Sequence, residues 1–76
     1  MGGMADVRSP EYQRMLKKLR QARKDARLTQ AQAGQAMGVR QTVISKIEKG
    51  DRKIDPFELR ALALKYGKNM EHFLDD

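Results

Sequence analysis

The sequence predicts one all-α domain built from five short helices. Apolar residues recur every three or four positions, which is the spacing of one helix face, and no stretch has the alternation of a strand. Along the chain, residues that commonly begin helices also alternate with glycines that commonly end them. Because the chain has only 76 residues, we expect a single domain over residues 9–76, preceded by a flexible segment at residues 1–8.

The first helix is expected to begin after Ser9. A serine can cap a helix, Pro10 suits the first helical position, and Glu11 suits the positive end of the helix dipole. The inward face carries, at helical spacing, Tyr12, Met15, Leu16, Leu19, Ala22 and Ala26, with Arg23 set among them. The outer face is basic, which suits a solubilising surface, an amphipathic membrane helix or the flank of a DNA site. A membrane helix would call for larger apolar residues.

The second helix is expected from Thr29 to about Met37, because Thr29 and Gln32 have the spacing of a capping box. Gly38 suits a left-handed helix end. Gly34 lies inside this helix, where glycine costs about 1 kcal/mol relative to alanine. We expect Gly34 to allow close packing of two short helices that cross steeply.

The third helix is expected from about Gln41 to Lys49, with Ile44 and Ile47 on its inward face. Because only about three residues separate it from the second helix, residues 29–49 predict a helix-turn-helix.

The fourth helix is expected to begin at Asp55, which forms a second capping box with Glu58, and to end before Gly67. Asn69 can cap a last turn or two. Besides its core face, this region has surplus apolar residues, namely Phe57, Ala61, Leu64, Met70, Phe73 and Leu74. Such a surplus favours self-association, so we expect these residues at a dimer interface.

Charge is distributed unevenly along the chain, whose net charge is +6. Residues 8–27 hold eight basic and two acidic residues, and residues 40–53 hold five basic and two acidic. Residues 54–76 hold three basic and five acidic. The first two-thirds therefore suit a polyanion such as nucleic acid or an anionic membrane surface, whereas the last third does not.

The segment LTQAQAGQAMGVRQTVISKIEKGDRKI, followed by DPFELRALALKYG, resembles the lambda-repressor-like, or XRE-type, helix-turn-helix family. The resemblance covers about residues 12–74 and implies a compact five-helix domain whose third helix enters the DNA major groove. It implies base-reading roles for Gln41, Thr42 and Lys46, with Ser45 beside them. It implies contacts with the DNA backbone from Gln30, Arg40, Lys49, Arg52 and Lys53. It also implies an internal salt bridge between Arg23 and Glu48.

Three residues depart from the family pattern. Arg27 stands where glycine is frequent, which implies a strained or differently shaped turn. Ala33 stands where leucine is usual, which thins the core. Arg40 stands where serine or threonine is frequent, so the third helix loses a side-chain cap worth about 1 kcal/mol. An arginine at that position suits a phosphate contact.

Other classes of function are not supported by the sequence. No nucleophile, base and oxyanion-stabilising groups can be assembled, so we expect no enzyme activity. His72 is the single histidine and the chain has no cysteine, so no metal or other cofactor is expected. No apolar run approaches the roughly 18 residues of a membrane span, so no membrane partner is expected.

The sequence thus predicts a sequence-specific, double-stranded-DNA-binding transcriptional regulator of the cytoplasm. We expect a repressor that binds a pseudo-palindromic operator as a homodimer. Two alternatives keep the same fold: the antitoxin of a toxin–antitoxin pair, with the toxin as protein partner, and a restriction–modification controller. A third alternative is a basic RNA-binding or protein-interaction module.

Overall fold

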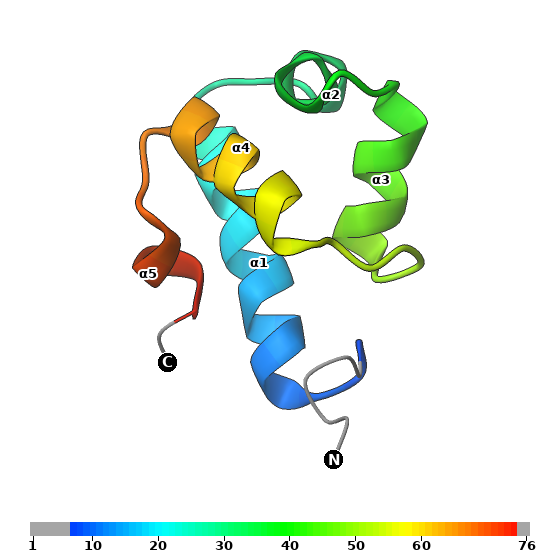
Figure 1. Ribbon diagram of the computed structural model, residues 1–76, viewed down its shortest axis with the longest axis vertical. Coiled ribbons are helices and arrows are strands. Elements are labelled where there is room, and N and C mark those ends of the chain that lie inside the picture. The colour runs from blue at the N-terminus through cyan, green and yellow to red at the C-terminus, as the bar shows by residue number, and fades with distance from the viewer. Residues whose placement is uncertain (1–6, 75–76) are drawn as a thin grey trace.

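The computed structural model describes residues 7–74, which form five helices joined by short connections (Figure 1). They are α1 (Pro10–Asp25), α2 (Gln30–Met37), α3 (Gln41–Lys49), α4 (Pro56–Tyr66) and α5 (Met70–Leu74). The described residues contain no strand, so the predicted all-α class is confirmed. Most of the segment predicted to be flexible, residues 1–6, lies outside the described residues.

Side-chain caps define where most of the helices begin. The capping residues of α1, α2, α4 and α5 are Ser9, Thr29, Asp55 and Asn69, each accepting a hydrogen bond from a backbone amide three residues later. Both predicted capping boxes form, and in the first the Thr29 amide donates in return to Gln32 Oε1 at 2.9 Å. The helix α3 differs, because Arg40 at its start makes no side-chain cap. The predicted loss of a cap at Arg40 is therefore present in the structure.

The core draws side chains from all five helices. In Figure 1, α1 runs behind α4, and α2, seen nearly end-on at the top, leads into α3 on the right. The helix α2 contacts α3, and α5 packs against α1. The buried hydrophobic residues are Met15, Leu16, Leu19, Ala22, Ala33, Ile44, Ile47, Leu59, Leu62, Ala63, Tyr66 and Phe73. Burying a large aliphatic side chain is worth about 1.5–3 kcal/mol. Because Ile44 and Ile47 are both fully buried, they fix which face of α3 points outward.

Gly34 is buried in α2 and lies directly against the backbone of the turn that follows. A Cβ atom at this position would lie 2.5 Å from the carbonyl oxygen of Val39, where no real Cβ atom fits. The chain reverses at Gly38, whose φ of 69° is accessible to glycine at little cost, and this brings Val39 back over Gly34. We expected the glycine to serve the crossing of two helices. In the structure, it is instead the backbone of the turn between the two helices that leaves no room for a side chain at Gly34.

Arg27 occupies a strained backbone conformation after α1. Its φ is 61°, and within residues 7–74 it is the single non-glycine residue with positive φ. The amide of Arg27 donates to the Lys24 carbonyl at 2.9 Å, and the amide of Leu28 donates to the Arg23 carbonyl at 3.1 Å. This arrangement is a common helix end, in which glycine usually takes the left-handed position. The strained turn implied by the family pattern is thus found at Arg27.

We predict that Gly34→Ala destabilises the domain by about 1–3 kcal/mol, because the new methyl group must displace the Val39 carbonyl. The loss should occur although alanine favours helix by about 1 kcal/mol over glycine. Thermal and urea unfolding would measure it. Gln35→Ala, at the next and exposed position of α2, is the control and should stay within about 0.5 kcal/mol of wild type. A Gly34→Ala variant as stable as wild type would contradict the constraint.

We predict that Arg27→Gly stabilises the domain by about 0.5–1 kcal/mol. A left-handed conformation costs a side-chain-bearing residue about 1–2 kcal/mol, and the greater freedom of glycine in the unfolded chain offsets part of that gain. The melting temperature should rise by a few degrees. Lys24→Gly removes the same charge from an exposed site within α1, and should lower stability by about 1 kcal/mol. Equal losses in both variants would show that Arg27 is not strained.

Candidate nucleic-acid interface

The outer face of α3 is polar and exposed. Gln41, Thr42 and Lys46 are exposed, and Ser45 is half-buried. These are the four residues for which base-reading roles were implied, and they lie on one short helix whose opposite face is held in the core. The first three can reach a ligand directly, whereas Ser45 has less free surface. The arrangement presents amide, hydroxyl and ammonium groups, which are the side-chain groups that hydrogen-bond to base edges.

Exposed cations lie at both ends of this helix. Arg40 precedes α3, Lys49 ends it, and Lys53 follows in the next connection. Within residues 7–74, the side chains of these three residues and of Lys46 form no hydrogen bond or ion pair. Their charges are therefore available to an anionic partner. A polar helix with cations at both ends suits a ligand that has negative charges on both sides of a polar groove.

Arg52 is placed differently from the other predicted backbone contacts. Its guanidinium forms two parallel hydrogen bonds to the Glu58 carboxylate, both of 2.9 Å. This hydrogen bonding is the main cause that lowers the pKa of Glu58 and raises that of Arg52. The pairing was not foreseen from the sequence. It fastens the connection after α3 to the first turn of α4, and it offsets the charge of Arg52.

A buried ion pair connects α1 to α3. Arg23 Nε donates to Glu48 Oε2 at 2.8 Å, and Arg23 Nη2 donates to Glu48 Oε1 at 3.1 Å. Arg23 Nη1 also donates to the Leu28 carbonyl at 3.0 Å, so the guanidinium joins three parts of the chain. Glu48 is only 5% exposed. The structure therefore brings together the two residues for which an internal salt bridge was implied.

The surroundings of the ion pair keep Arg23 charged and the nearby Tyr66 hydroxyl neutral. The hydrogen bonds that Arg23 donates to Glu48 raise the pKa of Arg23, against the lowering effect of burial, so the guanidinium stays charged. Burial raises the pKa of the Tyr66 hydroxyl to about 12, and the negative charge of Glu48 acts in the same direction. Tyr66 therefore stays neutral beside the pair across the physiological range.

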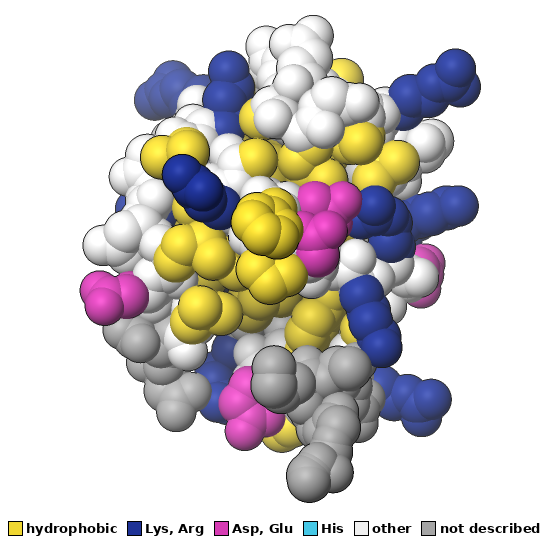
Figure 2. All heavy atoms as spheres, viewed as in Figure 1, with side chains coloured by type: hydrophobic (Ala, Val, Ile, Leu, Met, Phe, Trp, Pro, Cys, Tyr) yellow, Lys and Arg dark blue, Asp and Glu magenta, His cyan; other side chains and the backbone are white. Residues whose placement is uncertain are grey.

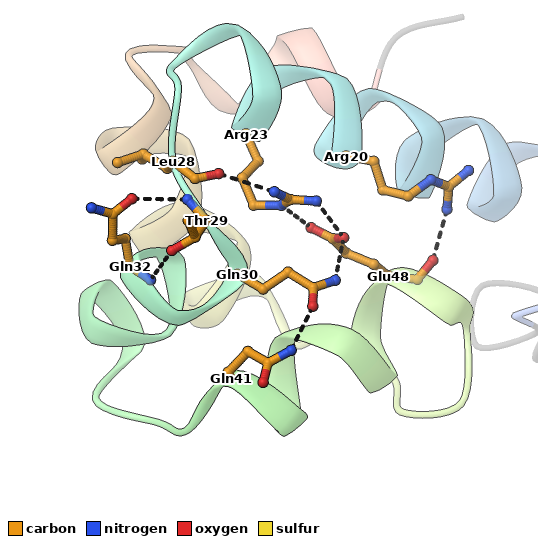
Figure 3. Close-up of polar contacts among 8 residues, drawn as sticks. All are labelled: Arg20, Arg23, Leu28, Thr29, Gln30, Gln32, Gln41 and Glu48. Atoms are coloured by element: carbon orange, nitrogen blue, oxygen red, sulfur yellow. Dashed lines mark hydrogen bonds and ion pairs between the residues drawn. The ribbon is translucent and has the colours of Figure 1, made fainter.

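Gln30 lies between the ion pair and the exposed face of α3 (Figure 3). Its Nε2 donates to Glu48 Oε1 at 3.0 Å, and its Oε1 accepts from Gln41 Nε2 at 2.8 Å. The resemblance implied a backbone contact for Gln30. The structure adds a second set of bonds, which no sequence pattern indicated, because they depend on how α2 and α3 are packed.

Arg20 of α1 holds the end of α3, a contact that the sequence did not indicate. Its Nη1 donates to the Glu48 carbonyl oxygen at 2.7 Å. A cation at the C-terminal end of a helix satisfies a carbonyl group there and suits the helix dipole. The available signal was its position three residues before Arg23, which places both on one side of α1.

The residues predicted for a dimer interface fall into two groups. Phe57 and Leu64 of α4 are 79% and 71% exposed, Leu74 of α5 is 62% exposed, and Ala61 is half-buried between the first two. Figure 2 shows hydrophobic side chains gathered over α4 in the middle of this face, with most Lys and Arg side chains at its edges. A shallow groove lined by Ala36, Met37, Asp55, Phe57, Glu58 and Ala61 borders them.

Two of the predicted interface residues belong with the core instead. Phe73 is 2% exposed, because α5 packs against α1 and turns this ring inward. Its assignment to an exposed interface was wrong. Met70 is half-buried and packs against the core, so it offers little free surface. Helical spacing alone could not separate these residues from Leu74, since a five-residue helix has too few turns to define its buried face.

A short helix, a tight turn and a second helix with an exposed polar face, flanked by cations, define a helix-turn-helix DNA-binding domain. The described residues contain no cluster of His, Asp or Glu that could hold a metal ion. No helix among residues 7–74 is both long enough and apolar enough to cross a membrane.

The helix-turn-helix family model matches residues 19–73, which is more than half of the chain. The chain therefore belongs to the XRE-type, lambda-repressor-like helix-turn-helix family, whose members are DNA-binding regulators. The resemblance inferred from the sequence is confirmed. Comparison with curated proteins and with solved structures gave no significant match.

Proposed function

We propose that this DNA-binding regulator is a sequence-specific repressor that binds a pseudo-palindromic operator as a homodimer. The observation that carries the proposal is the outer face of α3, where exposed Gln41, Thr42 and Lys46 lie between exposed Arg40 and Lys49. Base edges in the major groove are read by the polar side chains, and phosphates on either side are held by the cations. A dimer bound over a promoter would repress by excluding the polymerase.

The side chains proposed to contact the DNA backbone differ in whether they already form bonds within the protein. Arg40, Lys49 and Lys53 are free to meet phosphates, and Gln30 has one remaining Nε2 hydrogen for the same purpose. Arg52 keeps its Nε–H and one Nη2 hydrogen for a phosphate, but Glu58 already offsets its charge. We therefore assign the main electrostatic contribution to Arg40, Lys49 and Lys53, and a secondary one to Arg52.

Dimerisation is proposed through the exposed apolar residues Phe57, Ala61 and Leu64 of α4, together with Leu74. Two recognition helices about 34 Å apart can read successive major grooves on one face of DNA. A symmetric dimer uses the same patch on both subunits, and an uncharged apolar patch is compatible with itself. The chain from residue 54 onward is net acidic, which disfavours DNA as the occupant of this surface.

We predict that Gln41→Ala costs roughly 1–3 kcal/mol on the preferred site and relaxes one base-pair position in each half-site. The reason is that the side chain would no longer bond to a base edge. In-vitro selection of bound duplexes at fixed salt would give the motif of each variant. An identical motif for wild type and Gln41→Ala would place the recognition face elsewhere.

We predict that Lys49→Gln weakens binding to all sequences alike. The slope of log K against log salt should fall by about one unit, because one fewer counterion is released. Lys65→Gln, which removes the same charge from the exposed side of α4, is the control and should leave the slope unchanged. A slope that is equal in wild type and Lys49→Gln would remove Lys49 from the phosphate contacts.

We predict that Leu64→Glu yields a folded monomer with much weaker operator binding, because it places a charge in the apolar contact. Sedimentation equilibrium gives the oligomeric state, and circular dichroism checks the fold. Gln35→Glu introduces the same side chain at an exposed position of α2, outside the apolar stripe, and should remain dimeric. A wild-type protein that stays monomeric at high micromolar concentration, with one protein per operator, would contradict the dimer.

A further inference from the structure

Arg52 is tied to two helices at once. Its backbone amide donates to the Lys46 carbonyl at 3.2 Å, which ties it to the last turn of α3. Its guanidinium donates from Nη1 to Glu58 Oε1 and from Nη2 to Glu58 Oε2, both at 2.9 Å, which ties it to the first turn of α4. A long arginine side chain otherwise samples many rotamers. These bonds restrict Arg52 to one orientation, in a connection that also carries the exposed Lys49 and Lys53 at its two ends.

Glu58 is itself held in place, so it is a firm support for Arg52. Its Oε1 accepts a hydrogen bond from the Asp55 amide at 3.1 Å, and its own amide donates to Asp55 Oδ1 at 2.8 Å, which completes the capping box of α4. The Glu58 side chain is 20% exposed, whereas that of Arg52 is 39% exposed. The carboxylate is therefore the more buried member of the pair, and the arginine keeps free surface for a ligand.

The donors that Arg52 keeps lie together on one edge of its guanidinium. Nη1 donates to Glu58 and, at 3.4 Å, to the Lys53 carbonyl, and Nη2 gives one of its hydrogens to Glu58. Within residues 7–74, Nε–H and the second Nη2 hydrogen have no acceptor. In a planar guanidinium these two N–H groups are parallel neighbours, which is the arrangement that binds two oxygens of one phosphate.

We propose that Glu58 is a positioning residue for DNA binding, which holds Arg52 so that its Nε–H and Nη2–H together bind one backbone phosphate beside the C-terminal end of α3. This inference rests on the proposed function, in which DNA lies against the outer face of α3. A side chain that is already ordered loses less freedom on binding, and two parallel bonds fix the orientation of the phosphate. Glu58 thus aids binding although its charge is repelled by DNA.

Glu58→Gln separates positioning from charge, because the two effects have opposite signs. Glutamine can complete the same capping box, but its NH₂ group replaces one of the two acceptors and meets the Nη2 donor of Arg52, which releases the guanidinium. Operator affinity should fall by roughly 2–10-fold, the cost of immobilising one long side chain. If only charge mattered, removal of a carboxylate near the DNA would tighten binding. Anisotropy titrations at fixed salt would measure the change.

Glu71→Gln is the matched control for the loss of a carboxylate. Glu71 is exposed on α5, which lies on the opposite side of the domain from α3 (Figure 1). Its replacement should leave operator affinity unchanged. A Glu58→Gln variant that binds the operator as tightly as wild type, or more tightly, would overturn the positioning role.

A double-mutant cycle shows whether Glu58 acts through Arg52. In an Arg52→Gln background there is no guanidinium left to release, so only the charge effect of Glu58→Gln remains. The substitution should weaken binding in the wild-type background, and leave it unchanged or strengthen it in the Arg52→Gln background. Thermal melting of each variant checks the fold. Equal weakening in both backgrounds would show that Glu58 acts only through the stability of α4, and the proposal would fail.

Arg52→Lys tests the two-donor edge while Glu58 and the capping box stay intact. Lysine keeps the charge but has no parallel pair of donors, so operator affinity should fall by roughly 2–10-fold with the salt slope unchanged. If Gln41→Ala changes the selected motif while Arg52→Lys and Glu58→Gln bind like wild type, the positioning role is wrong and the proposed function stands. If Gln41→Ala leaves the motif unchanged while both variants weaken binding, the base-reading role is wrong and the phosphate contact stands.

Discussion

The buried pair between Arg23 and Glu48 is the interaction on which the rest of the structure depends. It joins α1 to α3 and, through the Leu28 carbonyl, to the connection before α2. A buried pair is not in itself strong evidence of stability, because removing two charges from water costs several kcal/mol. Its effect is geometric, because two charges that must meet with most water excluded favour the placement of α3 on α1 that brings them together. Removing one partner would leave the other charge buried and unpaired, at about 3–5 kcal/mol.

That placement divides the surface of the domain by function. Ile44 and Ile47 complete the core on the inner side of α3, so Gln41, Thr42 and Lys46 point outward and are not needed to fill the core. The exposed apolar residues Phe57 and Leu64 lie on a separate helix, α4, and belong to the proposed dimer surface. A chain of 76 residues thereby offers two separate surfaces, one polar and basic and one apolar.

Local signals predicted most of the fold, and tertiary contacts account for what they missed. The bounds of α2, α3 and α4 followed from capping residues and glycines, which act within a few residues and are visible in the sequence. The exposed face of α3 followed from the spacing of Ile44 and Ile47. Three features could not be predicted in this way: the pairing of Arg52 with Glu58, the bonds of Gln30, and the burial of Phe73. Each depends on a neighbour that only the folded chain brings close.

The missing cap at Arg40 has a consequence for motion. Four helices begin with a side chain that accepts a hydrogen bond from one of their first amides, whereas the first turn of α3 has no such side chain and Val43 N bonds to the Arg40 carbonyl. Opening that turn therefore breaks no side-chain cap. In hydrogen-exchange terms, we expect its amide protons to exchange through local fraying, and more readily than those in the middle of α1. The segment that carries Gln41 and Thr42 is thus also the helix start most able to adjust to a surface placed against it.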